Sequence, residues 1–201
     1  MKEATDLNPS YITNCVFNAF SSYTAIMLNV VTIYAIRKTT SLPKPLKTFL
    51  LSLGISDLGV GLFVQPLYTG HLVLELELEQ NSENIFSAWY ITANLFAFAS
   101  LFGVMALSAD RFLAIHLHLR YQELVTHKRV VAVVISIWML SAIISMVWFW
   151  DRGNIVNVIM AIINAACIIT TTFLNYKIYV AVRRHAHQID ALNSSPPSST
   201  E

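Results

Sequence analysis

An acid–base pair closes one of the long apolar stretches of the chain. Asp110 and Arg111 directly follow residues 100–109 (SLFGVMALSA). A charge inside a membrane helix costs about 2.5–3.5 kcal/mol, so such residues usually lie where the helix meets water or a partner. The position therefore predicts a charged pair at the cytoplasmic mouth of a membrane helix. The pair is either a flanking pair that only marks the membrane edge or a part of a functional switch.

Three polar residues interrupt apolar stretches near their middle: Asn29, Asp57 and Ser100. An ionisable residue at membrane depth is by default a candidate functional site. Asp57 would lie close to the membrane midplane, and the other two offer oxygen atoms at a comparable depth. Together they suit a small hard cation such as Na⁺, or a water cluster. The alternative is a protonated Asp57 that only makes hydrogen bonds between helices. Spacing does not separate these two interpretations.

Catalytic and metal-binding patterns are missing from the sequence. The histidines His116 and His118, like His185 and His187, are two residues apart, so each pair would point to different faces of a helix. No zinc motif, phosphate loop, dinucleotide fingerprint or nucleophile elbow occurs. We therefore expect no enzyme and no cofactor beyond a structural Na⁺ ion. The basic residues are expected to face lipids or set the topology rather than bind nucleic acid.

The composition is that of a membrane protein. The 201 residues are 55% hydrophobic and only 12% charged, whereas soluble domains carry about 25% charged residues. Runs of about 20 apolar residues are long enough to cross a bilayer. We predict an all-α membrane protein with five such helices, at residues 15–36, 48–68, 85–115, 130–150 and 155–182.

The distribution of basic residues sets the orientation. Of the 13 Lys and Arg residues, only Lys2 and Arg152 fall on the side of the N-terminus. Loops rich in Lys and Arg face the cytoplasm, so the N-terminus is expected outside. Residues 1–14 would be extracellular, residues 15–184 would form the bundle, and residues 185–201 would begin a disordered cytoplasmic loop.

The outer segment at residues 72–80 reads LVLELELEQ. Its period of two favours an extended conformation over a helix. It is either an acidic lip that attracts a cationic ligand or Ca²⁺, or a solvated connector, which is the commoner role of a charge run.

The order of these features resembles a rhodopsin-like G-protein-coupled receptor over its first five helices. Asp110-Arg111-Phe112 is similar to the family's Asp-Arg-Tyr box, and residues 53–57 (LGISD) resemble its second-helix Leu-x-x-x-Asp pattern. The other matching positions, in chain order, are Asn29 of helix one, Ser100 of the sodium site, Tyr121 of the second cytoplasmic loop, Trp138 of helix four and Tyr176 of helix five.

The resemblance implies a role for each position. It implies a seven-helix plasma-membrane receptor with an extracellular ligand, a heterotrimeric G protein and membrane lipids as partners. The G-protein switch would comprise Asp110, Arg111, Phe112, Tyr121 and Tyr176. A sodium site would comprise Asn29, Asp57 and Ser100. Asn94 and Ala97 would line the ligand pocket, and Trp138 would be structural.

Some positions depart from the family pattern. Phe86 stands where a disulfide-forming cysteine is usual, and Ile168 stands where helix five usually has proline. With the short link at residues 151–154, these departures resemble the melanocortin-type branch. Ala93 stands where receptors for biogenic amines carry an aspartate, which argues against an amine ligand.

The chain ends before a sixth helix, so it is expected to be part of a longer protein. Two other functions stay open at this stage. One is a transporter or channel with Asp57 as the ion ligand, and the other is a truncated partner of full receptors that does not itself signal.

Overall fold

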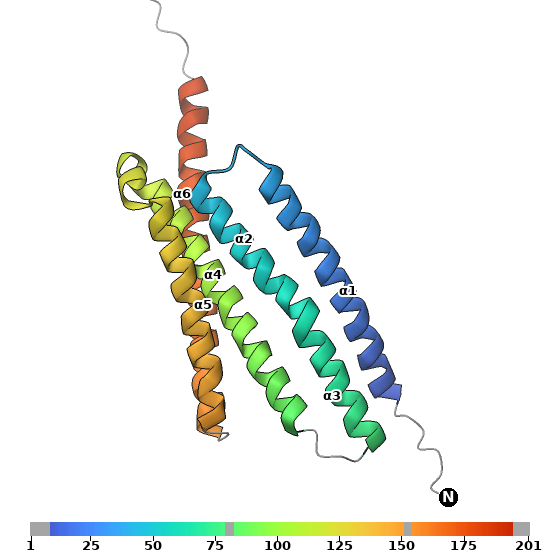
Figure 1. Ribbon diagram of the computed structural model, residues 1–201. Helices are drawn as coiled ribbons and strands as arrows, with labels where there is room; N and C mark the ends of the chain where they lie inside the picture. Colours follow the sequence, from blue (N-terminus) through green and yellow to red (C-terminus); the bar gives the residue numbers. More distant parts are fainter. Residues whose placement is uncertain (1–8, 79–82, 151–153, 195–201) are drawn as a thin grey trace, which may run out of the picture.

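The computed structural model describes residues 9–78, 83–150 and 154–194. All of the elements in these ranges are helical. They are α1 (Pro9–Lys38), α2 (Lys44–Gly59), the π-helical turn η1 (Val60–Val64), α3 (Gln65–Leu78), α4 (Glu83–Leu124), α5 (His127–Trp150) and α6 (Asn154–Ser194). The elements α2, η1 and α3 follow one another without a break and form a single rod (Figure 1). The prediction of an all-α fold is confirmed.

The helices carry five segments that are long and apolar enough to cross a membrane: Tyr11–Lys38, Lys44–Leu74, Glu83–Leu117, His127–Val147 and Ile155–Arg184. Large apolar side chains are exposed along them; Phe17 is 70% exposed, and Ile169 is 69% exposed. In water such surfaces would drive aggregation, whereas lipid tails solvate them. The fold is therefore that of a multi-pass membrane protein.

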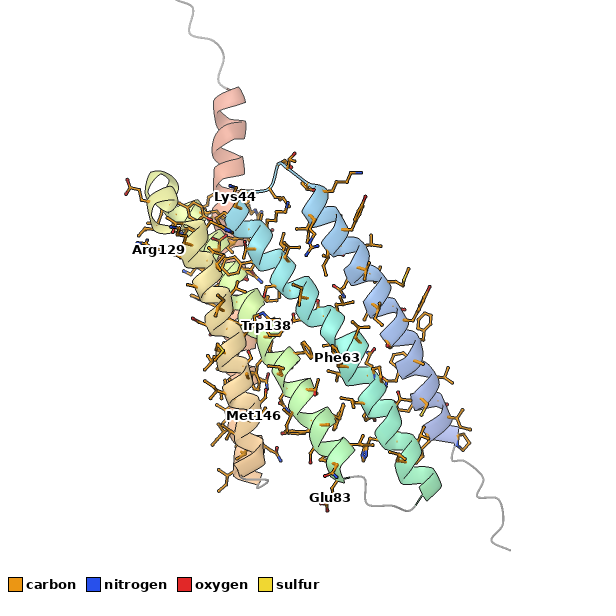
Figure 2. The ribbon with its side chains drawn as sticks, in the orientation of Figure 1. Lys44, Phe63, Glu83, Arg129, Trp138 and Met146 are labelled. Atoms are coloured by element: carbon orange, nitrogen blue, oxygen red, sulfur yellow. The ribbon has the colours of Figure 1, made fainter. Side chains whose placement is uncertain are left out.

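The long helix α4 is the centre of the bundle. It packs against α2, α5 and α6, whereas α1 packs against α2, η1 and α3 at the edge (Figure 1). A cluster of buried side chains from α4 and α6 forms the core, with Phe98 fully buried. Figure 2 shows Lys44 and Arg129 at one end of the bundle and Glu83 at the other. The basic end is the one that the positive-inside rule assigns to the cytoplasm.

Several boundaries differ from the predicted ones. The first helix begins at Pro9 rather than at residue 15. The acidic segment is helical up to Leu78, so the expectation of an extended conformation is wrong there. Leu and Glu both favour helices, and this propensity prevails over the period of two. Residues 79–82, which complete that segment, lie outside the described residues.

The last helix also extends further than predicted. Helix α6 reaches Ser194 instead of residue 182, so residues 185–194 are helical rather than disordered. The first residue that cannot continue a helix is Pro196, and nothing in residues 183–194 forces an earlier end. The remainder of the predicted loop, residues 195–201, lies outside the described residues.

A π-helical turn interrupts the second membrane segment, where the sequence predicted a regular helix. Such a turn displaces backbone carbonyls from their usual partners, and Pro66, two residues after it, lacks an N–H group. Side chains of α1 supply new donors: Ser22 Oγ donates to the Gly61 carbonyl at 2.8 Å, and Asn18 Nδ2 donates to the Gln65 carbonyl at 2.9 Å. This polar seam fixes α1 against the rod.

Candidate functional site

The inner end of α4 folds back on itself. Tyr121 donates a hydrogen bond to Asp110 Oδ1 at 2.7 Å, although the two residues are 11 positions apart. In a straight helix their Cα atoms would be about 16.5 Å apart, beyond the reach of the two side chains. The helix must therefore bend sharply between them, and Figure 1 shows its yellow-green end curling back beside α5. The bend brings the second-loop tyrosine onto the Asp-Arg-Phe box.

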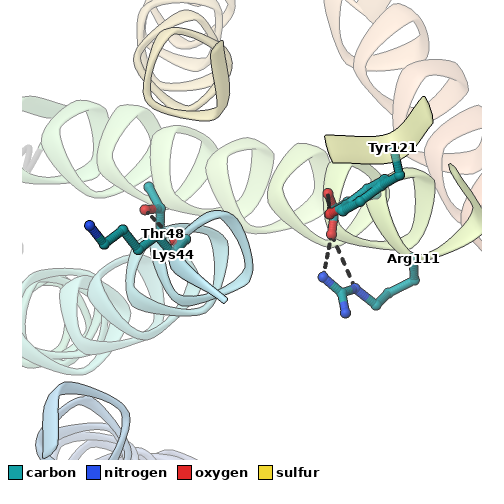
Figure 3. A network of polar contacts seen from close by, with 5 residues as sticks. Lys44, Thr48, Arg111 and Tyr121 are labelled. Atoms are coloured by element: carbon teal, nitrogen blue, oxygen red, sulfur yellow. Dashed lines mark hydrogen bonds and ion pairs between the residues drawn. The ribbon is translucent and has the colours of Figure 1, made fainter. Parts of the chain in front are cut away.

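Arg111 and Tyr121, labelled in Figure 3, both donate hydrogen bonds to Asp110, which is the centre of a compact polar network. Arg111 donates to Asp110 Oδ2 through Nη2 at 2.5 Å and through Nε at 3.1 Å, while the Tyr121 hydroxyl occupies the other carboxylate oxygen. The Asp110 side chain is 3% exposed, and that of Arg111 is 35% exposed. Burial makes the charge-assisted bonds stronger than they would be in water. The Asp110 carboxylate thus holds the Arg111 side chain at the basic end of the bundle.

The same contact changes the titration of Tyr121, which lies beyond the membrane-spanning part of α4. Burial raises the pKa of Tyr121 to about 12, and its hydrogen bond to the Asp110 carboxylate acts in the same direction. A raised tyrosine pKa means that the neutral, donating hydroxyl is the stable form. Tyr121 therefore stays a hydrogen-bond donor to Asp110 throughout the physiological pH range.

Two further predicted switch residues lie outside this network. Phe112 packs its ring on His116 with the ring centroids 4.0 Å apart, and His116 Nδ1 lies 3.0 Å from the Phe112 carbonyl at the bend. Tyr176 is on α6 and is 63% exposed. The structure thus joins Asp110, Arg111 and Tyr121, and it does not bring Tyr176 into the hydrogen-bonded group.

The structure joins two of the three residues predicted to form a polar centre, namely Asp57 and Ser100 but not Asn29. Ser100 Oγ donates to Asp57 Oδ1 at 3.3 Å and so links α4 to α2. Asn29 Nδ2 instead donates to the Ala25 carbonyl of its own helix at 2.9 Å. Carboxylate and hydroxyl oxygens are suitable ligands for a hard cation, so the donor types at Asp57 and Ser100 fit a Na⁺ ion. No cluster of three or more acidic, His or Cys side chains occurs among the described residues.

Trp138 connects three helices. Its Nε1 donates to Ser52 Oγ of α2 at 3.1 Å, and its ring meets the Phe96 ring of α4 edge-on with centroids 6.0 Å apart. Phe96 in turn stacks on Phe63 of η1. Trp138 is half-buried; a tryptophan N–H that is withdrawn from water usually needs a partner, and Ser52 provides it. The contacts are those of a structural residue.

The outer end of the bundle carries aromatic contacts where the family usually has a disulfide. The Phe86 ring lies 5.3 Å from the His71 ring of α3 and 5.5 Å from the Trp89 ring. Two residues of α4 were predicted to line the ligand pocket. Asn94 Nδ2 donates to the Tyr90 carbonyl within α4, and Ala97 is exposed. The ligand role of Asn94 and Ala97 stays a prediction.

Sequence reasoning missed Ser52 and Arg129. Arg129 Nη1 donates to the carbonyls of Leu124 at 2.9 Å and Glu123 at 3.5 Å, which end α4. A basic residue just after a helix is a known partner of its last carbonyls, so the position of Arg129 carried a usable signal. Ser52 carried none, because a serine inside an apolar helix usually bonds to its own backbone.

Comparison with known proteins identifies the family of the chain. Residues 28–180 match the sequence profile of the family described as "7 transmembrane receptor (rhodopsin family)". The chain belongs to this receptor family. The family segment includes the polar centre, the Asp-Arg-Phe box and Trp138, and it ends within α6.

Individual relatives come from different branches of the family. The chain is 28% identical to the adenosine receptor A2b of Gallus gallus over 70% of its own length and 40% of that receptor. It is 24% identical to the melanocortin receptor 3 of Rattus norvegicus over 87% of its length and 54% of that receptor. It is 26% identical to the histamine H1 receptor of Cavia porcellus over 90% of its own length and 41% of that receptor. The chain spans about half the length of these relatives, and the melanocortin-type assignment stays a prediction.

Proposed function

We propose that this chain provides the first five helices of a plasma-membrane receptor that passes an extracellular ligand signal to a heterotrimeric G protein. The observation that carries the proposal is the Asp110 network: a buried carboxylate holds Arg111 at the basic end of the bundle, and Tyr121 closes it. Family membership supports the same function. Neither observation favours an enzyme.

The proposed mechanism is a two-state switch. In the resting state Arg111 points toward Asp110, and its partial exposure leaves it close to the cytoplasmic surface. In the signalling state Arg111 leaves the carboxylate and contacts the G protein. A ligand can favour this second state only through a higher affinity for it than for the first.

The test is nucleotide exchange by purified heterotrimeric G proteins on membranes that contain the receptor expressed from its full coding sequence. We expect exchange above that of membranes without receptor, and Arg111→Gln should reduce it to that background because the G protein loses its cationic contact. Arg183→Gln, an exposed arginine on α6, is the matched control and should keep the activity. The proposal would be contradicted if membranes with the wild-type receptor gave no more nucleotide exchange than membranes without receptor for every class of G protein.

We also propose that Asp57 and Ser100 hold a Na⁺ ion. Two oxygen-bearing side chains of neighbouring helices already lie within hydrogen-bond distance there. NaCl is expected to raise the apparent Tm of the wild type above its value in choline chloride of equal strength, because an ion that binds only the folded state stabilises it. Asp57→Asn should remove this difference, and Ser100→Ala should reduce it. A sodium effect that persists in Asp57→Asn would exclude the site.

A further inference from the structure

The connection between α1 and α2 is a short segment at the basic end of the bundle (Figure 1). It comprises residues 39–43 (TTSLP), between the end of α1 at Lys38 and the start of α2 at Lys44. Pro43 is the N-cap of α2, with φ −55° and ψ 138°. The proline ring also disfavours a helical conformation of the residue before it. The two helices therefore cannot merge, and residues 40–42 form a bend at the surface.

The three hydroxyl groups of this connection differ in their surroundings. The Thr39 hydroxyl donates to the Ala35 carbonyl at 2.8 Å, and this side chain is half-buried. Thr40 and Ser41 are exposed, and within the described part of the chain neither hydroxyl has a hydrogen-bond partner. An enzyme can therefore reach the hydroxyls of Thr40 and Ser41, whereas that of Thr39 is occupied.

Basic residues flank the connection on both sides. Arg37 and Lys38 precede it, and Lys44 and Lys47 follow it. Lys47 Nζ donates to the carbonyls of Arg37 at 2.8 Å and Thr39 at 3.3 Å. Among the described residues, none of these four cations forms an ion pair with a carboxylate. Four cations without a counter-charge create a positive potential that favours an anionic group at this position.

The order of the residues matches a charge pattern that protein kinases recognise. Arg37 lies three positions before Thr40, and Lys38 lies two positions before it. Kinases distinguish substrates by the charges around the hydroxyl, and an acidic substrate groove is complementary to basic residues there. Ser41 has Lys38 three positions before it, and lysine lacks the planar fork with which arginine binds a carboxylate. Arg37 and Lys38 belong to the last turn of α1, which opens at little cost because helix ends fray.

We propose that Thr40 is a phosphorylation site for a serine/threonine kinase that selects basic residues before the hydroxyl. The kinase aspartate takes the proton of the Thr40 hydroxyl, and Oγ1 bonds to the γ-phosphorus of MgATP. The bond from this phosphorus to the bridging oxygen breaks, and ADP leaves. The product carries about two negative charges, and the flanking cations can bind its oxygens through charge-assisted hydrogen bonds. The proposal concerns this modification alone and does not depend on coupling to a G protein.

The test uses sealed inside-out membrane vesicles from cells that express the receptor from its full coding sequence. The vesicles are incubated with MgATP and the catalytic subunit of cyclic-AMP-dependent protein kinase, which selects basic residues before the hydroxyl. Mass spectrometry with fragmentation then locates the phosphate. We expect it on Thr40 in these vesicles and not in sealed right-side-out vesicles, because the positive-inside rule places the connection in the cytoplasm.

Two charge variants test how the kinase recognises the site. Arg37→Gln should lower the initial rate of phosphorylation at Thr40 about tenfold, because the kinase loses one charge-assisted contact. Lys44→Gln removes an exposed cation on the other side of the connection and should leave the rate unchanged. Figure 2 shows Lys44 at this end of the bundle. Both substitutions change exposed side chains, so both variants should fold, which their level at the cell surface checks.

Neighbouring hydroxyls test the position of the phosphate. Thr40→Val should leave residues 39–43 without phosphate, whereas Ser41→Ala should keep the wild-type rate. Thr126 is an internal control, because it is exposed in the α4–α5 connection but has Glu123 three positions before it. It should stay unmodified under the same conditions.

Three results would overturn the proposal: absence of phosphate from Thr40 in inside-out vesicles, equal effects of Arg37→Gln and Lys44→Gln, or phosphorylation of Thr126 as fast as that of Thr40. Phosphate on Ser41 in place of Thr40 would contradict the assignment to Thr40.

Discussion

Asp110→Asn is expected to raise basal G-protein activation about tenfold in the receptor expressed from its full coding sequence. The substitution keeps the shape of the side chain but removes its charge, so Arg111 loses two charge-assisted hydrogen bonds. Bonds to charged groups contribute about 1.5–3 kcal/mol, and a loss of about 1.4 kcal/mol changes a two-state equilibrium tenfold. The resting state loses this stabilisation, while the signalling state, in which Arg111 has left the carboxylate, does not.

Matched variants distinguish loss of the Asp110–Arg111 interaction from a nonspecific effect of substitution on the receptor. Tyr121→Phe removes only the hydroxyl that donates to Asp110, so it should raise basal exchange less than Asp110→Asn does. Glu123→Gln removes an exposed carboxylate near the same bend and should have no effect. Each value is divided by the amount of receptor at the cell surface. Basal exchange of Asp110→Asn at or below the wild-type level would contradict the switch.

The sequence predicted the membrane fold well, because each span needs about 20 apolar residues and the bilayer enforces that length. It also predicted that Asp57 and Ser100 lie together, since the order of motifs in the family places them at similar depth. Helix ends were predicted less well. Helices α4 and α6 extend past the apolar segments, and hydropathy does not report where a helix continues into water.

Contacts that depend on backbone irregularity could not be predicted from the sequence. The hydrogen bond between Tyr121 and Asp110 requires the bend at the end of α4, and no proline or glycine at residues 111–120 indicates one. The π-helical turn was not predicted either, although the sequence carries a signal for it. Pro66 follows Gln65 in the second apolar run, and the polar residues Asn14, Asn18 and Ser22 recur every four positions on α1 opposite it. That spacing places them on one helical face.

Gly59→Ala is expected to lower the apparent Tm by about 4–8 °C, because a Cβ atom has less room there than at the other glycines that the structure describes. A Cβ atom at Gly59 would lie 2.2 Å from Cε1 and 2.4 Å from Cζ of Phe96. The Phe96 ring has little room to retreat, because Phe63 stacks on it and the Trp138 ring meets its edge. Overpacking of this kind costs about 1–3 kcal/mol.

The measurement is thermal unfolding in detergent, followed by circular dichroism and size-exclusion chromatography. Gly70→Ala is the matched control, because a Cβ atom there has nothing within 4 Å. It should keep or raise the apparent Tm, since alanine favours a helix over glycine by about 1 kcal/mol. The double variant Gly59→Ala/Phe96→Leu should be less destabilised than the sum of its single variants, because the smaller side chain leaves room for the methyl group. Equal Tm values for Gly59→Ala and the wild type would mean that the Phe96 ring is free to move. That result would exclude close packing of α2, α4 and α5 around Trp138.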